Sequence, residues 1–260
     1  MRTKHVAFLA LILLLPWVSA CTESGAMPVT VLGGGVTAAG GYSCPSATYL
    51  SHYDMDHGTG TNYLCENDGG ADLQGTQSGG TISASYGQSG NGFRSQAKDT
   101  YVEFVSDAED ICDKDVGTVW MSVRLDTLAS DSSIWEFVYD ATNQMSMSVR
   151  ADGKIQFYYC ANSVSDGIRS DATFAIADSN WYRIGFSWDN TVGTGSSSAT
   201  VGVAAWKEDT NEEFGTWQGT PDAMAIGENA SVNSQNFTGQ DISIDNVRCI
   251  GSYQAADPGV

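Results

Sequence analysis

The amino-acid sequence predicts an all-β domain, an antiparallel β-sandwich of the jelly-roll kind. Short runs of strand-forming residues recur along the chain and are separated by Gly, Asn, Asp and Ser. Several runs alternate apolar and polar residues with the period of two that is typical of a half-buried strand. No segment shows a convincing helical pattern, so two packed sheets are expected. The expected strands are residues 81–86, 101–105, 118–126, 133–139, 145–150, 154–160, 181–188, 199–207 and 242–250.

The alternation is clearest in the segments 118–126 and 181–188. In the first, the apolar side chains that share a face are Val119, Met121, Val123 and Leu125. The opposite face carries Trp120 and Arg124. In the second, the shared face is that of Tyr182, Ile184, Phe186 and Trp188. Between two further runs, Asp152-Gly153 is a strong signal for a tight hairpin turn, which predicts that these runs are paired.

The first twenty residues resemble a bacterial lipoprotein signal peptide. Arg2 and Lys4 precede an apolar run at 6–15, which is too short to cross a bilayer because spanning takes about 20 residues. Val-Ser-Ala then leads into Cys21, which resembles a lipobox. The resemblance implies cleavage after Ala20 and a lipid on the Cys21 sulfur. Ordinary secretion, with Cys21 as a chance thiol, is the alternative.

These features divide the chain into three parts. Residues 1–20 are the expected signal peptide, and residues 21–41, rich in small residues and glycine, are expected to form a flexible tether. Residues 42–255 are the expected folded domain. The protein is therefore expected to be exported and anchored to the cell envelope by lipid. The outer membrane is favoured, because Thr22 rather than Asp follows the cysteine.

The charge of the chain excludes some partners. The whole sequence has a net charge of −19, and loss of Arg2 and Lys4 with the signal peptide takes the mature chain to −21. Nucleic acid is not an expected partner, because its phosphates need cationic side chains. Anionic lipid headgroups are not attracted either, so the membrane is expected to be reached only through the lipid.

The cysteines indicate disulfides in an oxidising compartment. With Cys21 set aside, the remaining five are Cys44, Cys65, Cys112, Cys160 and Cys249. An odd number permits at most two bridges and leaves one thiol. A Cys44–Cys65 bridge is the first candidate, because it closes a short loop, although sequence alone does not determine connectivity.

Three segments together resemble the concanavalin A-like lectin/glucanase superfamily, in its laminin-G-like branch. They are Asp152-Gly153-Lys154-Ile155-Gln156-Phe157, then Trp181-Tyr182-Arg183-Ile184-Gly185-Phe186-Ser187-Trp188-Asp189, then Ile244-Asp245-Asn246-Val247-Arg248. Their order and spacing also match across residues 80–250. The resemblance implies a jelly roll and a wide range of functions, since this superfamily includes lectins, glycoside hydrolases, polysaccharide lyases and interaction domains.

The catalytic motifs of that superfamily are missing. Its glucanases carry Glu-x-Asp-x-x-Glu on one strand, because catalysis takes two carboxylates across the scissile bond. Here Glu136 is followed by Val138 and Ala141 in place of the second and third acids. The histidines, His5, His52 and His57, lie outside the predicted central strands. The sequence therefore favours binding over catalysis, with a diverged glycoside hydrolase or polysaccharide lyase as the alternative.

Five residues are candidates for carbohydrate binding. They alternate with predicted core residues and so point away from the core: Trp120, Arg124, Glu136, Gln156 and Tyr158. Flat aromatic rings stack on the C–H faces of sugars, and planar polar groups hydrogen-bond hydroxyls. The competing interpretation is that Trp120 and Tyr158 pack in a second layer.

The loop at 52–62 is a candidate calcium site. Asp54 and Asp56 precede Gly58 in an Asp-x-Asp-x-Gly pattern, which resembles the start of an oxygen-rich calcium loop. The full EF-hand pattern is not met, because Cys65 stands at its twelfth position. Asp245 is a candidate partner for a structural calcium ion. A polar turn without metal is the alternative.

Together these features predict a membrane-anchored, lectin-like binding module. Its expected partner is a polysaccharide or glycoconjugate, or an envelope protein. A structural or assembly lipoprotein of the envelope is a further alternative.

Overall fold

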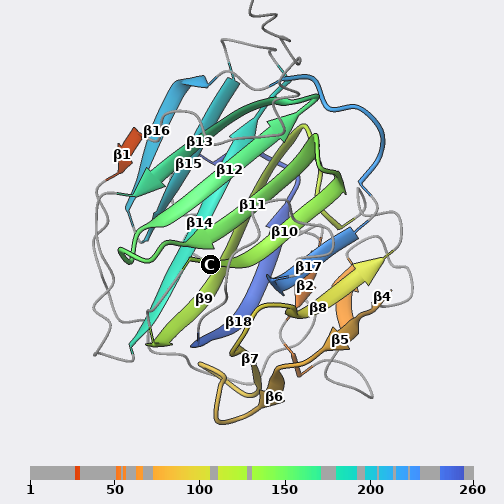
Figure 1. The fold of residues 1–260 in the computed structure, drawn as a ribbon, viewed down its shortest axis with the longest axis vertical. Coiled ribbons are helices and arrows are strands. Elements are labelled where there is room, and N and C mark those ends of the chain that lie inside the picture. The colour runs from red at the N-terminus through yellow and green to blue at the C-terminus, as the bar shows by residue number, and fades with distance from the viewer. Residues whose placement is uncertain are drawn as a thin grey trace, which may run out of the picture.

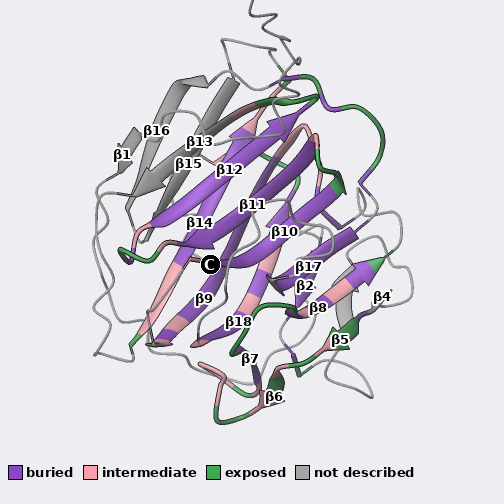
Figure 2. Ribbon diagram, in the orientation of Figure 1, coloured by how far each residue is buried: buried purple, intermediate pink, exposed green. Residues whose placement is uncertain are grey.

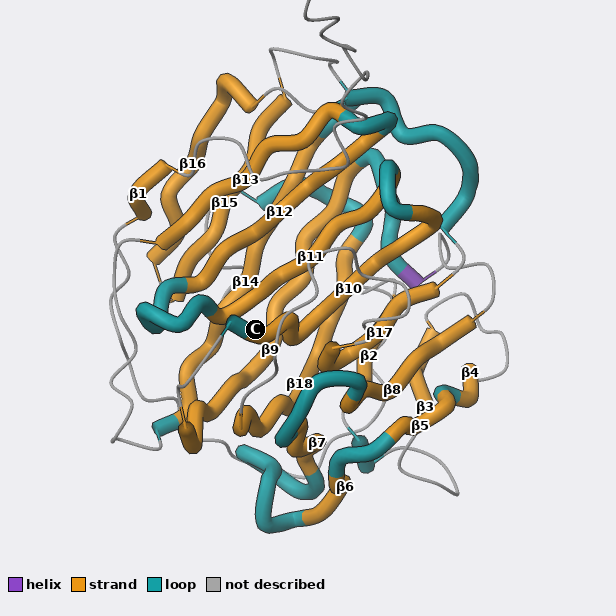
Figure 3. The backbone as a smooth tube through the Cα atoms, in the orientation of Figure 1, coloured by secondary structure: helices purple, strands orange, loops and turns teal. Residues whose placement is uncertain are grey.

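The computed structural model describes residues 27–29, 51–53, 55–56, 63–66, 73–105, 111–127, 131–170, 180–191, 197–203, 205–212, 215–221, 223–228 and 241–254. These residues fold almost entirely as strands joined by loops (Figure 3). The strands form two sheets, called A and B, stacked face to face (Figure 1). The predicted all-β antiparallel sandwich is therefore confirmed.

Sheet A contains eight strands within the described residues. In spatial order they are β1 (Met27–Val29), β13 (Val164–Ser170), β12 (Ile155–Ala161), β11 (Asn143–Val149), β10 (Ser132–Asp140), β17 (Ala223–Glu228), β8 (Thr100–Val105) and β5 (Thr76–Ser78). All neighbours are antiparallel except β1, which pairs parallel with β13 at the edge. Met27–Val29 lies in the segment expected to be a tether, so these three residues belong to the sheet instead.

Sheet B lies behind sheet A in the view of Figure 1. Its main path is β16 (Ala205–Glu212), β15 (Ser197–Val203), β14 (Trp181–Asp189), β9 (Val116–Thr127), β18 (Asp241–Ile250), β2 (Ser51–Tyr53), β3 (Tyr63–Glu66) and β4 (Leu73–Gln74). A hairpin of β6 (Thr81–Ser83) and β7 (Gly92–Ser95) joins the sheet through β18. Residues 242–244 of β18 pair with β9 on one side and with β7 on the other, so each is the middle of a row of three neighbouring residues.

The core between the sheets is made by the faces that the alternation predicted. Val119, Met121, Val123 and Leu125 of β9 are buried in it, and so are Ile184, Phe186 and Trp188 of β14. Aromatic rings from both sheets meet there: Phe157 stacks on Phe186 at 4.1 Å between ring centroids. Trp135 contacts Phe186 edge to face at 5.2 Å. The middle strands of sheet A are buried along most of their length (Figure 2).

The predicted turn at Asp152-Gly153 joins β11 to β12. Gly153 has a φ of 81°, a backbone conformation that glycine adopts without steric cost. The Gly153 N–H donates to the Arg150 carbonyl at 2.7 Å, and the Lys154 N–H donates to Asp152 Oδ1 at 3.1 Å. The pairing of these two strands is therefore confirmed.

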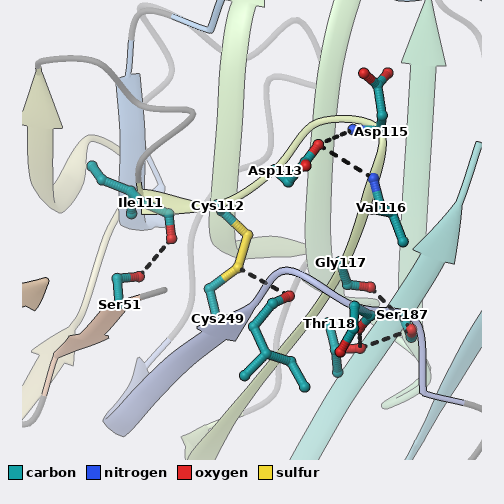
Figure 4. Close-up of a disulfide and its surroundings, with 12 residues drawn as sticks. Ser51, Ile111, Cys112, Asp113, Asp115, Val116, Gly117, Thr118, Ser187 and Cys249 are labelled. Carbon is teal, nitrogen blue, oxygen red and sulfur yellow. Dashed lines mark hydrogen bonds between the residues drawn. A yellow bond between two sulfur atoms is a disulfide. The ribbon is translucent and has the colours of Figure 1, made fainter. Parts of the chain in front are cut away.

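A disulfide between Cys112 and Cys249 connects the segment before β9 to the end of β18 (Figure 4). The two cysteines are 137 residues apart in sequence and both are buried. Beside them, the Ser51 hydroxyl donates to the Ile111 carbonyl at 2.7 Å. The bridge thus joins the segment that leads into β9 to β18, the last strand of the chain.

The strand predictions failed where the strands are short or where two were merged. The expected strand at 199–207 is a hairpin of β15 and β16. The short strands β2 to β5, β7 and β17 were not predicted, and neither was β13, whose sequence Val-Ser-Asp-Gly-Ile-Arg-Ser has no clear alternation. Pairing with neighbours, rather than local pattern, places these segments in the sheets.

Candidate functional site

Four of the five candidate binding residues are buried. Trp120, Glu136, Gln156 and Tyr158 point away from the main core as predicted, but their exposed fractions are 2%, 1%, 0% and 1%. Trp120 clusters with Ile250, and Tyr158 clusters with Cys160, both apart from the main core. These four side chains therefore pack in a second layer, and the expectation that they line an open surface is wrong. Strand alternation reveals which face a side chain takes, but not whether that face is covered.

Arg124 differs from the other four because it is half-buried. Its side chain retains 20% exposure on the outer face of sheet B. The guanidinium carbon lies 5.4 Å from the centroid of the Trp181 ring, and Trp181 is its direct partner on β14. Arg124 Nε donates to Asp126 Oδ1 at 3.1 Å. An arginine, an aromatic ring and a carboxylate thus form one unit.

A second unit of the same kind is formed by β7, β18 and the loop that precedes β7. Arg94 Nε donates to Asp241 Oδ1 at 2.6 Å, and its NH2 group donates to the other carboxylate oxygen. The Arg94 guanidinium also lies 4.8 Å from the centroid of the Tyr86 ring. Its NH1 group donates to the Tyr86 hydroxyl at 2.9 Å. The Arg94 side chain retains 23% exposure.

Ser243 of β18 lies between the two units. It is the cross-strand partner of Arg124 on one side and of Arg94 on the other. Its hydroxyl is 3.3 Å from both Arg124 NH2 and Asp126 Oδ2. We call this set the arginine row. Its members are Trp181, Arg124, Asp126, Ser243, Asp241, Arg94 and Tyr86.

The arginine row is electrostatically balanced. Each of its two guanidiniums is paired with an aspartate, and the hydrogen bonds with Asp241 raise the pKa of Arg94 above its ordinary value. Sequence reasoning found only Arg124 in this row. The alternation that places Tyr182 inward also places Trp181 outward, so Trp181 could have been found from the sequence. Arg94 and Asp241 could not, because the pairing of β7 with β18 leaves no local pattern in the sequence.

A pair of carboxylates lies elsewhere on the same face. Asp245 of β18 accepts hydrogen bonds at Oδ2 from the backbone N–H groups of Gln88 and Ser89, at 2.8 and 3.1 Å. Its other oxygen, Oδ1, is buried and has no hydrogen-bond partner. Asp56 accepts from the Asn91 backbone at 3.0 Å. The loop before β7 is thus held by Asp245 and Asp56.

Burial raises the pKa of Asp245 to about 7, and the negative charge of Asp56 adds to this effect. Asn246, which follows Asp245, has a φ of 54°, and the pairing of β18 with β9 shifts register at this point. Such a bulge redirects the strand and the side chains beside it. Asp54 lies outside the described residues, and among those described no three His, Cys, Asp or Glu residues are grouped as a metal site would require.

The disulfide at Cys160 limits which of the cysteine predictions can hold together. Cys21, Cys44 and the Cys65 side chain lie outside what the structure describes, but Cys160 is disulfide-bonded. Since Cys112 pairs with Cys249, the sequence leaves only Cys21, Cys44 and Cys65 as partners for Cys160. A lipid on Cys21 and a Cys44–Cys65 bridge therefore exclude one another in a monomer.

In the part of the chain that the structure describes, no helix is long and apolar enough to span a bilayer.

Solved structures of similar fold come from toxins and a sialidase. The botulinum neurotoxin serotype C1 binding domain is 9% identical with a TM-score of 0.56, covering 80% of this chain and 49% of its own. The serotype D binding domain is 9% identical with a TM-score of 0.55, covering 79% and 49%. Trypanosoma rangeli sialidase in complex with sialic acid is 11% identical with a TM-score of 0.52, covering 82% and 32%.

These similarities establish the β-sandwich fold. The chain spans about half the length of the toxin binding domains and about a third of the sialidase. No model of a protein family matches the sequence, and no curated protein matches it.

Proposed function

We propose that this protein is a lipid-anchored, lectin-like module of the cell envelope that binds a glycan through the arginine row. The observation that carries the proposal is the unit of Trp181, Arg124 and Asp126 on the outer face of sheet B. It combines a ring that can stack on a sugar with a donor and an acceptor for its hydroxyls.

The arginine row is suited to binding because its side chains are held before a ligand arrives. Arg124 is fixed by the Trp181 ring, by Asp126 and by Ser243. Less side-chain freedom is lost on binding when the contact groups are already ordered. Arg124, Trp181 and Ser243 stand on paired strands rather than in loops, which keeps their spacing fixed.

The similar structures support this proposal at the level of fold. One is the sialidase bound to sialic acid, and another is the binding domain of botulinum neurotoxin DC in complex with SialylT. Because the chain matches only part of each, the sugar sites of those proteins are not transferred to residues here. The proposed location on sheet B is supported by the arginine row alone.

Native gel electrophoresis through a panel of polysaccharides tests the proposal. At least one polysaccharide should slow the wild-type soluble domain, and Trp181→Ala should migrate as in a plain gel. Tyr139→Ala is the matched control, because Tyr139 is an exposed aromatic residue on β10 of sheet A. Migration unaffected by every polysaccharide, or equal slowing of Trp181→Ala and wild type, would contradict the proposal.

The anchor rests on the lipobox-like sequence that ends at Cys21. Cells grown with an alkyne-tagged fatty acid should label the wild-type protein and not Cys21→Ala. In the labelled protein, non-reducing peptide mapping should join Cys160 to Cys44 or Cys65, because lipid removes Cys21 as a partner. An unlabelled wild-type protein, or a Cys21–Cys160 peptide, would contradict the proposed lipid anchor.

The proposal includes a structural calcium ion held by Asp245 and Asp56, with Asp54 as a further ligand. The unpartnered, buried Oδ1 of Asp245 supports it, because calcium takes carboxylate oxygens as ligands. A bound cation would also neutralise the repulsion between the two carboxylates.

A further inference from the structure

The arginine row repeats one chemical unit twice in line. Trp181 with Arg124 and Asp126 forms the first copy, and Tyr86 with Arg94 and Asp241 forms the second. In each copy the guanidinium is paired with a carboxylate and lies against an aromatic ring. Their arginines stand on β9 and β7, which are far apart in sequence and flank β18 in sheet B, and Tyr86 comes from the loop before β7.

The spacing of the two copies follows from the sheet. Arg124 on β9 and Arg94 on β7 are both direct partners of Ser243 on β18. They are therefore two strand spacings apart, or about 10 Å. Ser243 between them is small and buried, and its hydroxyl contacts Arg124 and Asp126, which are themselves members of the row. This distance is longer than one sugar ring and suits consecutive units of a chain.

The charges of the row select against anionic ligands. Arg94 already donates from Nε and NH2 to both oxygens of Asp241. A ligand carboxylate or sulfate would have to displace that aspartate or approach two carboxylates, in a protein whose net charge is −19. A guanidinium has five N–H groups, so each arginine still has donors for neutral hydroxyls.

We propose that the two halves of the arginine row are successive subsites for one extended, neutral glycan chain. This inference rests on the proposed function and adds that the ligand is neutral and spans more than one sugar unit. The ligand lies across the strands, with one ring over Trp181 and a later ring over Tyr86.

Titration calorimetry with neutral laminari- and cello-oligosaccharides, from disaccharide to hexasaccharide, tests the inference. Galacturonate oligosaccharides of the same lengths serve as the anionic comparison. A neutral series should bind, with affinity that rises from disaccharide to hexasaccharide, and the galacturonates should bind at least tenfold more weakly. Tyr86→Ala should lower the hexasaccharide affinity about three- to tenfold, the range for one aromatic contact, with little effect on the disaccharide. Tyr86→Phe should keep most of the affinity.

Three patterns of oligosaccharide binding overturn the inference while leaving glycan binding intact. They are tighter binding of galacturonates than of neutral sugars, an affinity independent of chain length, and equal losses for disaccharide and hexasaccharide in Tyr86→Ala. Absence of binding to both neutral series, with a polysaccharide from the gel panel still bound through Trp181, also overturns the inference alone. No binding to any polysaccharide or oligosaccharide removes the proposed function as well. Melting temperatures of each variant separate local effects from unfolding.

Discussion

Trp181 and Arg124 face one another across adjacent strands, with the guanidinium carbon 5.4 Å from the ring centroid. Cation–π contact and the ion pair with Asp126 hold both side chains on the outer face of sheet B. The contact defines one end of the arginine row. Arg124 keeps part of its side chain exposed there, whereas Glu136, Gln156 and Tyr158 of sheet A are buried.

Trp120→Ala is expected to destabilise the fold rather than to abolish binding. The Trp120 ring is buried against Ile250, and the Arg183 guanidinium carbon lies 5.7 Å from the centroid of that ring. Truncation of a buried tryptophan typically costs about 3–5 kcal/mol of unfolding free energy. Urea denaturation measures this loss. A stable Trp120→Ala protein that no longer binds polysaccharide would instead show that Trp120 is a contact residue.

Removal of the Cys112–Cys249 bridge should lower stability. A crosslink across 137 residues restricts the unfolded chain strongly, so the double variant Cys112→Ser/Cys249→Ser should lose about 2–5 kcal/mol of unfolding free energy. Circular dichroism should still show a β-rich spectrum at low temperature. Equal denaturation midpoints for wild type and double variant would mean that the bridge contributes nothing to the fold.

Asp245 should make the folded protein less stable as pH rises in calcium-free buffer. Burial raises the pKa of Asp245 to about 7, above the ordinary carboxyl range of the unfolded chain. Between these two values the folded state keeps a proton that the unfolded state loses, so stability falls as pH rises and the loss is complete above neutral pH. Compared with Asp245→Asn, the wild type should lose up to about 4 kcal/mol of unfolding free energy as the pH rises from the ordinary carboxyl range to above neutral. Parallel stability–pH curves for the two proteins would contradict the raised pKa.

Calcium should offset the loss of stability that ionisation of Asp245 causes. The ion binds the ionised carboxylate, so calcium should raise the wild-type melting temperature more above neutral pH than in mild acid. Asp245→Asn should respond much less, and magnesium serves as the comparison cation. An unchanged melting temperature after chelator and after added calcium would sink the calcium proposal.

The long strands and their faces could be predicted because alternation is a local property. Val119 to Leu125 and Tyr182 to Trp188 take the sides that their sequence indicates. Whether the opposite faces are covered is not local. Trp120 and Tyr158 lie on such faces and are buried by neighbours that no spacing in their own strands reveals.

The arginine row could be predicted only in part for the same reason. Arg124 and Trp181 lie on strands recognisable from the sequence, and both take the expected outer face. Arg94 belongs to a four-residue strand, and its position beside Ser243 depends on a pairing with β18 across about 150 positions of sequence, as the spacing of Arg94 and Asp241 shows. Short strands of this kind are placed by tertiary contacts rather than by propensity.

Nuclear magnetic resonance of the isotope-labelled soluble domain can locate the glycan-binding surface directly. Proton–nitrogen spectra of backbone and side-chain groups would be recorded during titration with the polysaccharide or oligosaccharide that the gels identify. The Trp181 indole signal, assigned with Trp181→Phe, is expected to shift together with the Nε signals of Arg124 and Arg94. Shifts confined to sheet A, at the Gln156 amide and residues around Tyr158, would contradict a binding surface on sheet B.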